Sequence, residues 1–178
     1  GPYTYAAQIL LNPKADALQG FKREWLRYYT SITPGQSSRM VKYLLVDPAS
    51  AKKKGSDYTT LWIVGLATDQ NYYALDFIRD RLSLTERTER VFNLHRKWKP
   101  RFVRYEKYGM MADIEHIKTR QEQENYRFDV TEVGGITKKE DRIGRLIPIF
   151  EQGRFYLPKS LHITTYEKVS IDLVRSFI

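Results

Sequence analysis

Short runs of apolar residues, each bounded by turn residues, predict three strands in the first half of the chain. The first run ends in a carboxylate, Asp47, and Pro48 directly after it prevents the strand from continuing. The predicted strands cover residues 41–47, 59–67 and 71–81. Since only short connections separate them, we expect the three strands to pair as an antiparallel meander.

From residue 83 the pattern changes to the three- and four-residue spacing of an amphipathic helix, which ends before Pro100. Ser83 and Glu86 have the spacing of a capping box at its start. The elements expected after it are a strand over 101–106, a helix over 110–124, a strand over 127–133, a helix from the capping box of Thr137 and Glu140 to about Phe150, a strand over 154–157 and a helix over 165–178. Strands that alternate with helices imply parallel crossovers. We therefore predict an α/β fold, a mixed central sheet flanked by helices.

The beginning of the chain has a less regular pattern. Residues 21–29 have the spacing of a short helix, and residues 30–39, rich in Thr, Ser, Pro and Gly, are typical of a linker. We expect an N-terminal arm over residues 1–39 and one compact domain over residues 40–178.

The composition points to a folded domain with a polyanionic partner. A hydrophobic content of 42% argues against disorder, and the absence of cysteine excludes disulfides and thiolate-bound zinc. Thirty Lys and Arg against 21 Asp and Glu give a net charge of +9, which favours nucleic acid over a merely basic, soluble surface. No apolar run approaches the ~20 residues of a membrane span, and no secretory signal is present, so we expect no membrane partner.

Three acids are candidates for one metal site. Asp47 and Glu106 each end an apolar strand, and Asp57 comes just before the second strand. If the strands of Asp47 and Glu106 are parallel neighbours, all three carboxylates lie at the edge where open α/β sheets bind ligands. Mg²⁺ or Mn²⁺ is the natural counter-charge, and two such ions about 3.5–4 Å apart would hydrolyse a phosphodiester. The alternative is that each acid is a loop cap or a surface residue.

Two basic clusters are candidates for DNA binding. Lys52, Lys53 and Lys54 lie in the loop between two of the acids, where they either contact a DNA backbone or remain solvated. Lys138 and Lys139 lie at an expected helix N-terminus after two glycines, where backbone amides favour a phosphate.

Other polar residues are interpreted as structural. We expect Asp76 and Asp80 to form ion pairs with neighbours such as Arg79 and Arg81, or to be solvated, and His95 to pack on the apolar side of its helix.

Five short motifs together resemble the nuclease domain (C-terminal) of tailed-bacteriophage large terminase subunits. They are Val-Asp-Pro-Ala at 46–49, Gly-Ser-Asp at 55–57, Arg-Tyr-Glu-Lys-Tyr-Gly at 104–109, Lys-Glu-Asp-Arg-Ile at 139–143 and the segment 148–158. Residues 5–13, followed by Phe21 and Trp25, are similar to the segment that joins the family's ATPase domain to its nuclease.

The resemblance implies an RNase H-like fold and a metal-dependent endonuclease that cuts concatemeric double-stranded DNA by a two-metal mechanism during viral genome packaging. It implies a location in the host cell cytoplasm and, in the full-length protein, the ATPase domain, portal and small terminase as partners. Carried over by motif, Asp47 is the central metal ligand, Glu106 the second carboxylate and Asp57 an auxiliary ligand. Lys139 and Arg142 face DNA or brace the acids.

One feature departs from the family pattern. The family's last catalytic acid lies in an Asp-Asp pair, which this chain lacks, and the neighbours of Asp172 do not match that motif. We therefore expect the last acid beyond Ile178. Two alternatives to a terminase nuclease remain: an RNase H-like nuclease of the resolvase or transposase type, and a non-catalytic basic DNA-binding module.

Overall fold

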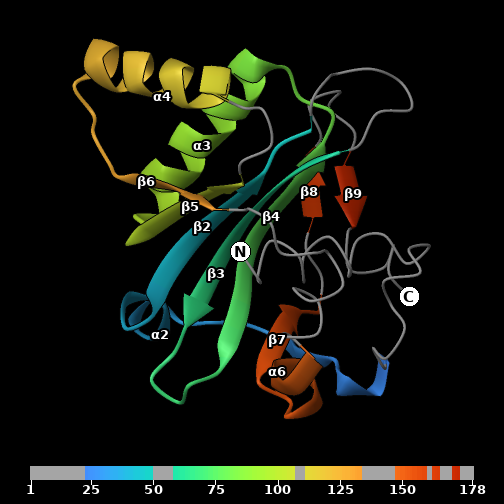
Figure 1. The fold of residues 1–178 in the computed structure, drawn as a ribbon. Coiled ribbons are helices and arrows are strands. Elements are labelled where there is room, and N and C mark those ends of the chain that lie inside the picture. The colour runs from blue at the N-terminus through green and yellow to red at the C-terminus, as the bar shows by residue number, and fades with distance from the viewer. Residues whose placement is uncertain are drawn as a thin grey trace.

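A seven-stranded mixed sheet forms the centre of the protein (Figure 1). The computed structural model describes residues 23–49, 58–106, 111–133, 147–159, 162–164 and 170–172. The sheet has the order β1-β7-β4-β3-β2-β5-β6. Its strands are β1 (Arg27–Tyr29), β2 (Val41–Asp47), β3 (Thr59–Leu66), β4 (Tyr72–Asp80), β5 (Phe102–Glu106), β6 (Val130–Val133) and β7 (Phe155–Pro158). The predicted α/β class is confirmed.

The pairing of the central strands follows the sequence prediction. β2, β3 and β4 form the antiparallel meander, while β5 pairs parallel with both β2 and β6. On the other side of the sheet, β7 pairs parallel with both β4 and β1. The carboxyl ends of β2 and β5 therefore meet at one edge of the sheet.

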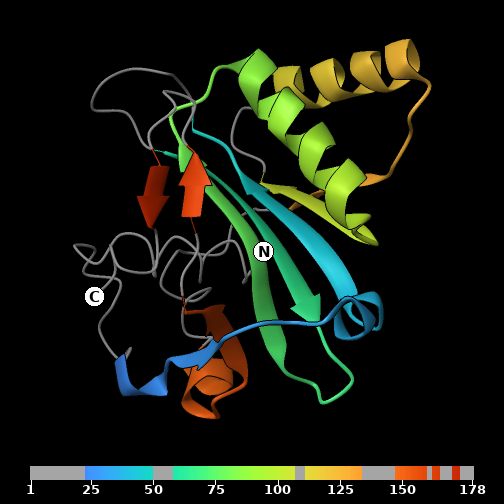
Figure 2. The same ribbon diagram turned by 180° about the vertical axis from the view of Figure 1, so that it is seen from behind.

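Two long helices, α3 (Leu84–Trp98) and α4 (Met111–Glu124), lie on the same face of the sheet (Figures 1 and 2). The predicted capping box at the start of α3 is present: the Glu86 amide donates to Ser83 Oγ at 3.3 Å, and the Ser83 amide donates to the Glu86 carboxylate at 2.7 Å. The shorter helices are η2 (Arg23–Trp25), α2 (Pro34–Ser38) and α6 (Ile147–Glu151). None of the helices in the described ranges is long and apolar enough to cross a membrane.

Both faces of the central strands are buried. Under α3 and α4 the core includes Leu44, Val46, Leu61, Ile63, Val91, Phe92, Val103, Tyr105 and Ile117. On the opposite face Leu45, Trp62 and Phe77 lie side by side on β2, β3 and β4, each at most 3% exposed. This explains why the strands are nearly continuous apolar runs rather than alternating ones.

The expectations for the start of the chain are corrected. The helix expected over 21–29 is present only as the single turn η2, and it is wrong at Arg27–Tyr29, which form β1 beside β7. The Tyr29 hydroxyl donates to the carbonyl of Ala74 on β4 at 2.5 Å, a distant contact that overrides the local helical spacing. The expected linker contains α2, which begins with a capping box of Thr33 and Gln36. The domain boundary near residue 40 stays a prediction.

The expectations for the end of the chain are also corrected. The helix expected over 165–178 is wrong at Ser170–Asp172, which form β9 and pair antiparallel with β8 (His162–Thr164) in a separate two-stranded sheet. The three register pairs between these two strands override the local helical spacing. The expected capping box at Thr137 and Glu140 lies outside the described residues.

Candidate metal centre

The parallel pairing of β2 with β5 brings Asp47 and Glu106 together. Val46 is the register partner of Tyr105, so the next residue on each strand, Asp47 and Glu106, occupies the neighbouring position, about 4.8 Å away. Val46 and Tyr105 belong to the core under α3, so the two acids point to the opposite face. Glu106 is 4% exposed, and Oδ2 of Asp47 is buried.

The same row of the sheet continues across β3 and β4. Thr60 is the register partner of Asp47, and Arg79 is the register partner of Thr60. Directly opposed residues of paired strands share a face. One row therefore presents, in order, a guanidinium, a hydroxyl and two carboxylates on the face that α3 and α4 do not cover.

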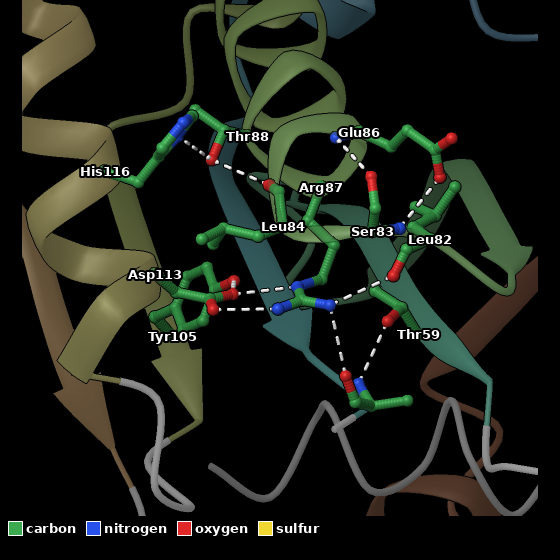
Figure 3. A network of polar contacts seen from close by, with 11 residues as sticks. Thr59, Leu82, Ser83, Leu84, Glu86, Arg87, Thr88, Tyr105, Asp113 and His116 are labelled. Carbon is green, nitrogen blue, oxygen red and sulfur yellow. Dashed lines mark hydrogen bonds and ion pairs between the residues drawn. The ribbon is translucent and has the colours of Figure 1, made fainter. Parts of the chain in front are cut away.

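A buried polar network links α3 and α4 to the ends of strands on the face of the sheet that these helices cover (Figure 3). Arg87 of α3 donates from Nε and Nη2 to the Asp113 carboxylate of α4, both at 2.8 Å. Its Nη1 donates to the carbonyls of Leu82 and Ala49, at 3.0 and 3.2 Å. The amide of Ala49 in turn donates to Oγ1 of Thr59 at 2.9 Å. This network fixes the backbone directly after Asp47.

The network also fixes the residue before Glu106. The hydroxyl of buried Tyr105 donates to Oδ2 of Asp113. Burial, and then the Asp113 charge, raises the pKa of Tyr105, so the hydroxyl remains a donor. Burial disfavours the charge of Arg87, but the hydrogen bonds and charge of Asp113 outweigh it and raise the Arg87 pKa. One charged pair thus braces the chain on both sides of the candidate site.

The chemistry of the two acids suits a hard divalent cation. Mg²⁺ prefers oxygen ligands and is commonly held by one or two carboxylates together with substrate phosphates. Asp47 and Glu106 supply two such carboxylates from neighbouring strand ends. Within the described ranges, no three His, Cys, Asp or Glu residues gather closely enough to hold a metal.

The remaining predicted site residues are not brought to this edge by the described structure. Asp57, Lys52, Lys53, Lys54, Lys138, Lys139 and Arg142 lie outside the described residues. Asp172, the late candidate acid, lies on β9 opposite His162, in the separate two-stranded sheet. The roles of all these residues stay predictions.

We did not predict a place beside the candidate site for Arg79 of β4 or for Arg81, which directly follows it. Asp76 does form an ion pair, but with Lys97 of α3 at 3.4 Å, and it accepts a hydrogen bond from Trp98 Nε1 at 2.9 Å. Arg79 and Arg81 are an odd number of residues away from Asp76 and so lie on the opposite face, with the acids of the candidate site. The alternation of side chains along the strand could have shown that these arginines share a face.

The prediction that His95 packs on the apolar side of α3 is confirmed.

The fold is similar to that of solved nuclease domains of viral terminases. The large terminase nuclease from thermophilic phage G20c has a TM-score of 0.59 at 13% identity, with 90% of this chain and 94% of that chain covered. Its form with bound magnesium has a TM-score of 0.55 at 12% identity, covering 89% and 87%. The human cytomegalovirus terminase nuclease domain, Mn soaked and inhibitor bound, has a TM-score of 0.50 at 16% identity, covering 82% and 76%.

These similarities confirm the RNase H-like fold class, and they confirm at the level of the fold the resemblance to large-terminase nuclease domains. No protein-family model and no curated protein matches the sequence.

Proposed function

We propose that the chain is the metal-dependent DNA endonuclease domain of a viral DNA-packaging terminase. The observation that carries this proposal is the placement of Asp47 and Glu106 at neighbouring positions on parallel strands, on one face of an RNase H-like sheet. Two carboxylates at neighbouring strand ends offer the hard oxygen ligands that a divalent cation prefers. The metals of the similar structures support the same chemistry, since these were solved with magnesium, cobalt, zinc or manganese.

Asp47 and Glu106 would hold the cation, and Arg87 would keep their backbones in place through Ala49 and Tyr105. When bound, a pair of divalent ions supplies an activated water and neutralises charge at the scissile phosphodiester. Asp57 remains the proposed third ligand, and Lys52, Lys53, Lys54, Lys138, Lys139 and Arg142 the proposed DNA contacts. The net charge of +9 supports double-stranded DNA as the substrate.

The wider setting belongs to the same proposal. A terminase nuclease would cut concatemeric DNA in the host cell cytoplasm, alongside the ATPase domain, portal and small terminase. The fold of the similar viral domains supports this setting.

Cleavage of supercoiled plasmid tests the proposal. With Mn²⁺ or Mg²⁺ the protein should cut the plasmid, and a chelator should stop it. Asp47→Asn and Glu106→Gln should each lower the rate at least about 100-fold, because metal stabilisation of the transition state is worth several kcal/mol. Glu122→Gln is the matched control, since it removes an exposed carboxylate from α4. Unchanged cleavage by both site variants would contradict the proposal.

A calorimetric titration with Mn²⁺ separates a nuclease from a DNA-binding module. The nuclease should give saturable heat that Asp47→Asn and Glu106→Gln remove. A module that only binds DNA would give no saturable metal heat. Its DNA affinity would fall steeply with salt and would not depend on the metal.

A further inference from the structure

Arg79 of β4 and Arg81, which directly follows this strand, lie around one aromatic ring at the edge of the sheet that carries the acids. The guanidinium carbon of Arg79 lies 3.7 Å from the ring centroid of Tyr58, and that of Arg81 lies 4.1 Å from it. Tyr58 immediately precedes β3, and Arg81 immediately follows β4. The three side chains therefore form one compact cluster where this pair of strands ends.

The cluster concentrates positive charge without a matching carboxylate in the described structure. Neither guanidinium takes part in any ion pair between residues that the structure describes. Nε of Arg81 is buried and donates to no acceptor among these residues. Burial lowers the pKa of Arg79, and the nearby charge of Arg81 acts in the same direction. Two guanidiniums held this closely are stabilised by an anion that accepts from both.

The position of the cluster connects it to the candidate metal centre. Arg79 faces Thr60, which faces Asp47, so Arg79 is two strand spacings, about 10 Å, from the acid along one row. Between them lies Oγ1 of Thr60, which is buried and has no hydrogen-bond partner among the described residues. One strand of duplex DNA rises about 3.4 Å per nucleotide, so this row spans roughly three nucleotides.

We propose that Tyr58, Arg79 and Arg81 bind backbone phosphates of the DNA strand that enters the metal centre, a few nucleotides from the scissile bond. This inference rests on the proposed nuclease function and adds a binding site to it. Arginine suits the role because its planar fork of donors matches the phosphate oxygens. Tyr58 holds the two guanidiniums together through cation–π contact, and a side-chain hydrogen bond with Tyr58 also acts on Arg79.

DNA affinity, measured by fluorescence anisotropy with a labelled duplex in EDTA over a series of salt concentrations, tests the inference without cleavage. The double variant Arg79→Ala/Arg81→Ala should bind roughly tenfold or more weakly, because charge-assisted hydrogen bonds to phosphate are lost. The slope of log affinity against log salt should fall by about 2, one for each phosphate contact.

The matched control is Arg101→Ala/Arg127→Ala, which removes the same charge from exposed positions before β5 and after α4. It should leave the slope close to that of the wild type. Arg79→Lys/Arg81→Lys keeps the charge but not the fork, and it should bind with intermediate affinity. Equal slopes and affinities for the two alanine variants would overturn the inference.

Two further measurements distinguish phosphate binding from a purely structural role of the arginines. If Arg79 and Arg81 only brace the acids, the double alanine variant would lose saturable Mn²⁺ heat, and that result would overturn the inference; we expect its metal heat to be unchanged. In cleavage assays the variant should raise KM more than it lowers kcat. The wild-type protein could also bind DNA through this cluster and yet not cut it with Mn²⁺. That result would contradict the proposed nuclease function but would support the DNA-binding site.

Discussion

At the residue scale, core residues and candidate metal ligands are direct neighbours along the same strand and point to opposite faces of the sheet. Val46 and Tyr105 point into the core under α3, whereas Asp47 and Glu106, one residue further, point to the opposite face. The last residue of each strand can therefore be polar without disturbing the packing beneath it.

His95 shows how packing at one residue makes stability depend on pH. Its ring stacks on Phe128, with centroids 4.1 Å apart, and its Nδ1 lies 2.6 Å from the Tyr126 hydroxyl. Burial, assisted by the charges of Lys99 and Arg96, lowers the pKa of His95 to about 4. In the unfolded chain the pKa is about 6.5, so between these values the unfolded state binds the extra proton. This contribution to stability is therefore present above pH 6.5 and lost as pH falls towards 4.

We predict that His95→Gln reduces the fall in Tm between pH 7 and pH 4.5, although it lowers the Tm at pH 7 through lost stacking. Thermal unfolding followed by circular dichroism at a series of pH values measures this. Asn93→Gln, an exposed change on the same helix, should keep the wild-type pH dependence. A His95→Gln variant that follows the wild-type curve would show that other groups cause the acid sensitivity.

At the element scale, α3 and α4 are joined by the ion pair of Arg87 with Asp113, whose side chains are 6% and 3% exposed. Breaking a buried pair leaves a charge without compensation, whereas replacing both partners by apolar residues restores packing. We predict that Asp113→Ala lowers the free energy of unfolding by about 3–5 kcal/mol. The double variant Arg87→Met/Asp113→Leu should be much closer to the wild type.

Urea unfolding measures these differences, and Mn²⁺ titration adds a functional readout. Since Arg87 also holds the carbonyl of Ala49, the stable double variant should still bind Mn²⁺ more weakly than the wild type. Wild-type metal affinity in that variant would show that the network serves the fold alone.

The length and periodicity of an element decide whether the sequence could predict it. β2, β3, β4, α3 and β5 are long or strongly periodic, so their local pattern determines them. β1 and β9 each have three residues, too few for a periodic signal, and β1 also depends on β7, far away in the chain. Of the candidate site, Asp47 and Glu106 were predictable because each ends an apolar run. The Arg79 and Arg81 cluster depends on cross-strand register with Tyr58, which only the folded sheet supplies.

At the scale of the whole molecule, the two faces of the sheet have separate tasks. One face is covered by α3 and α4 and carries the network that positions the strand ends (Figures 2 and 3). The other carries the two acids, with Arg79 of the arginine cluster in the same row. Part of the positive charge of the chain thus lies on the same face as the two candidate metal ligands.

The position of β1 has a practical consequence for any shortened form of this protein. β1 covers the outer edge of β7, with Arg27, Tyr28 and Tyr29 opposite Tyr156, Leu157 and Pro158. A fragment that begins at residue 40 lacks this strand, so it would leave the backbone of β7 open to pairing with another molecule. We predict that its apparent mass in light scattering rises with protein concentration more steeply than that of the full chain. The same concentration dependence for both forms would mean that a three-residue strand does not protect the edge of β7 from pairing. If the prediction holds, a shortened form of the protein should start well before Arg27.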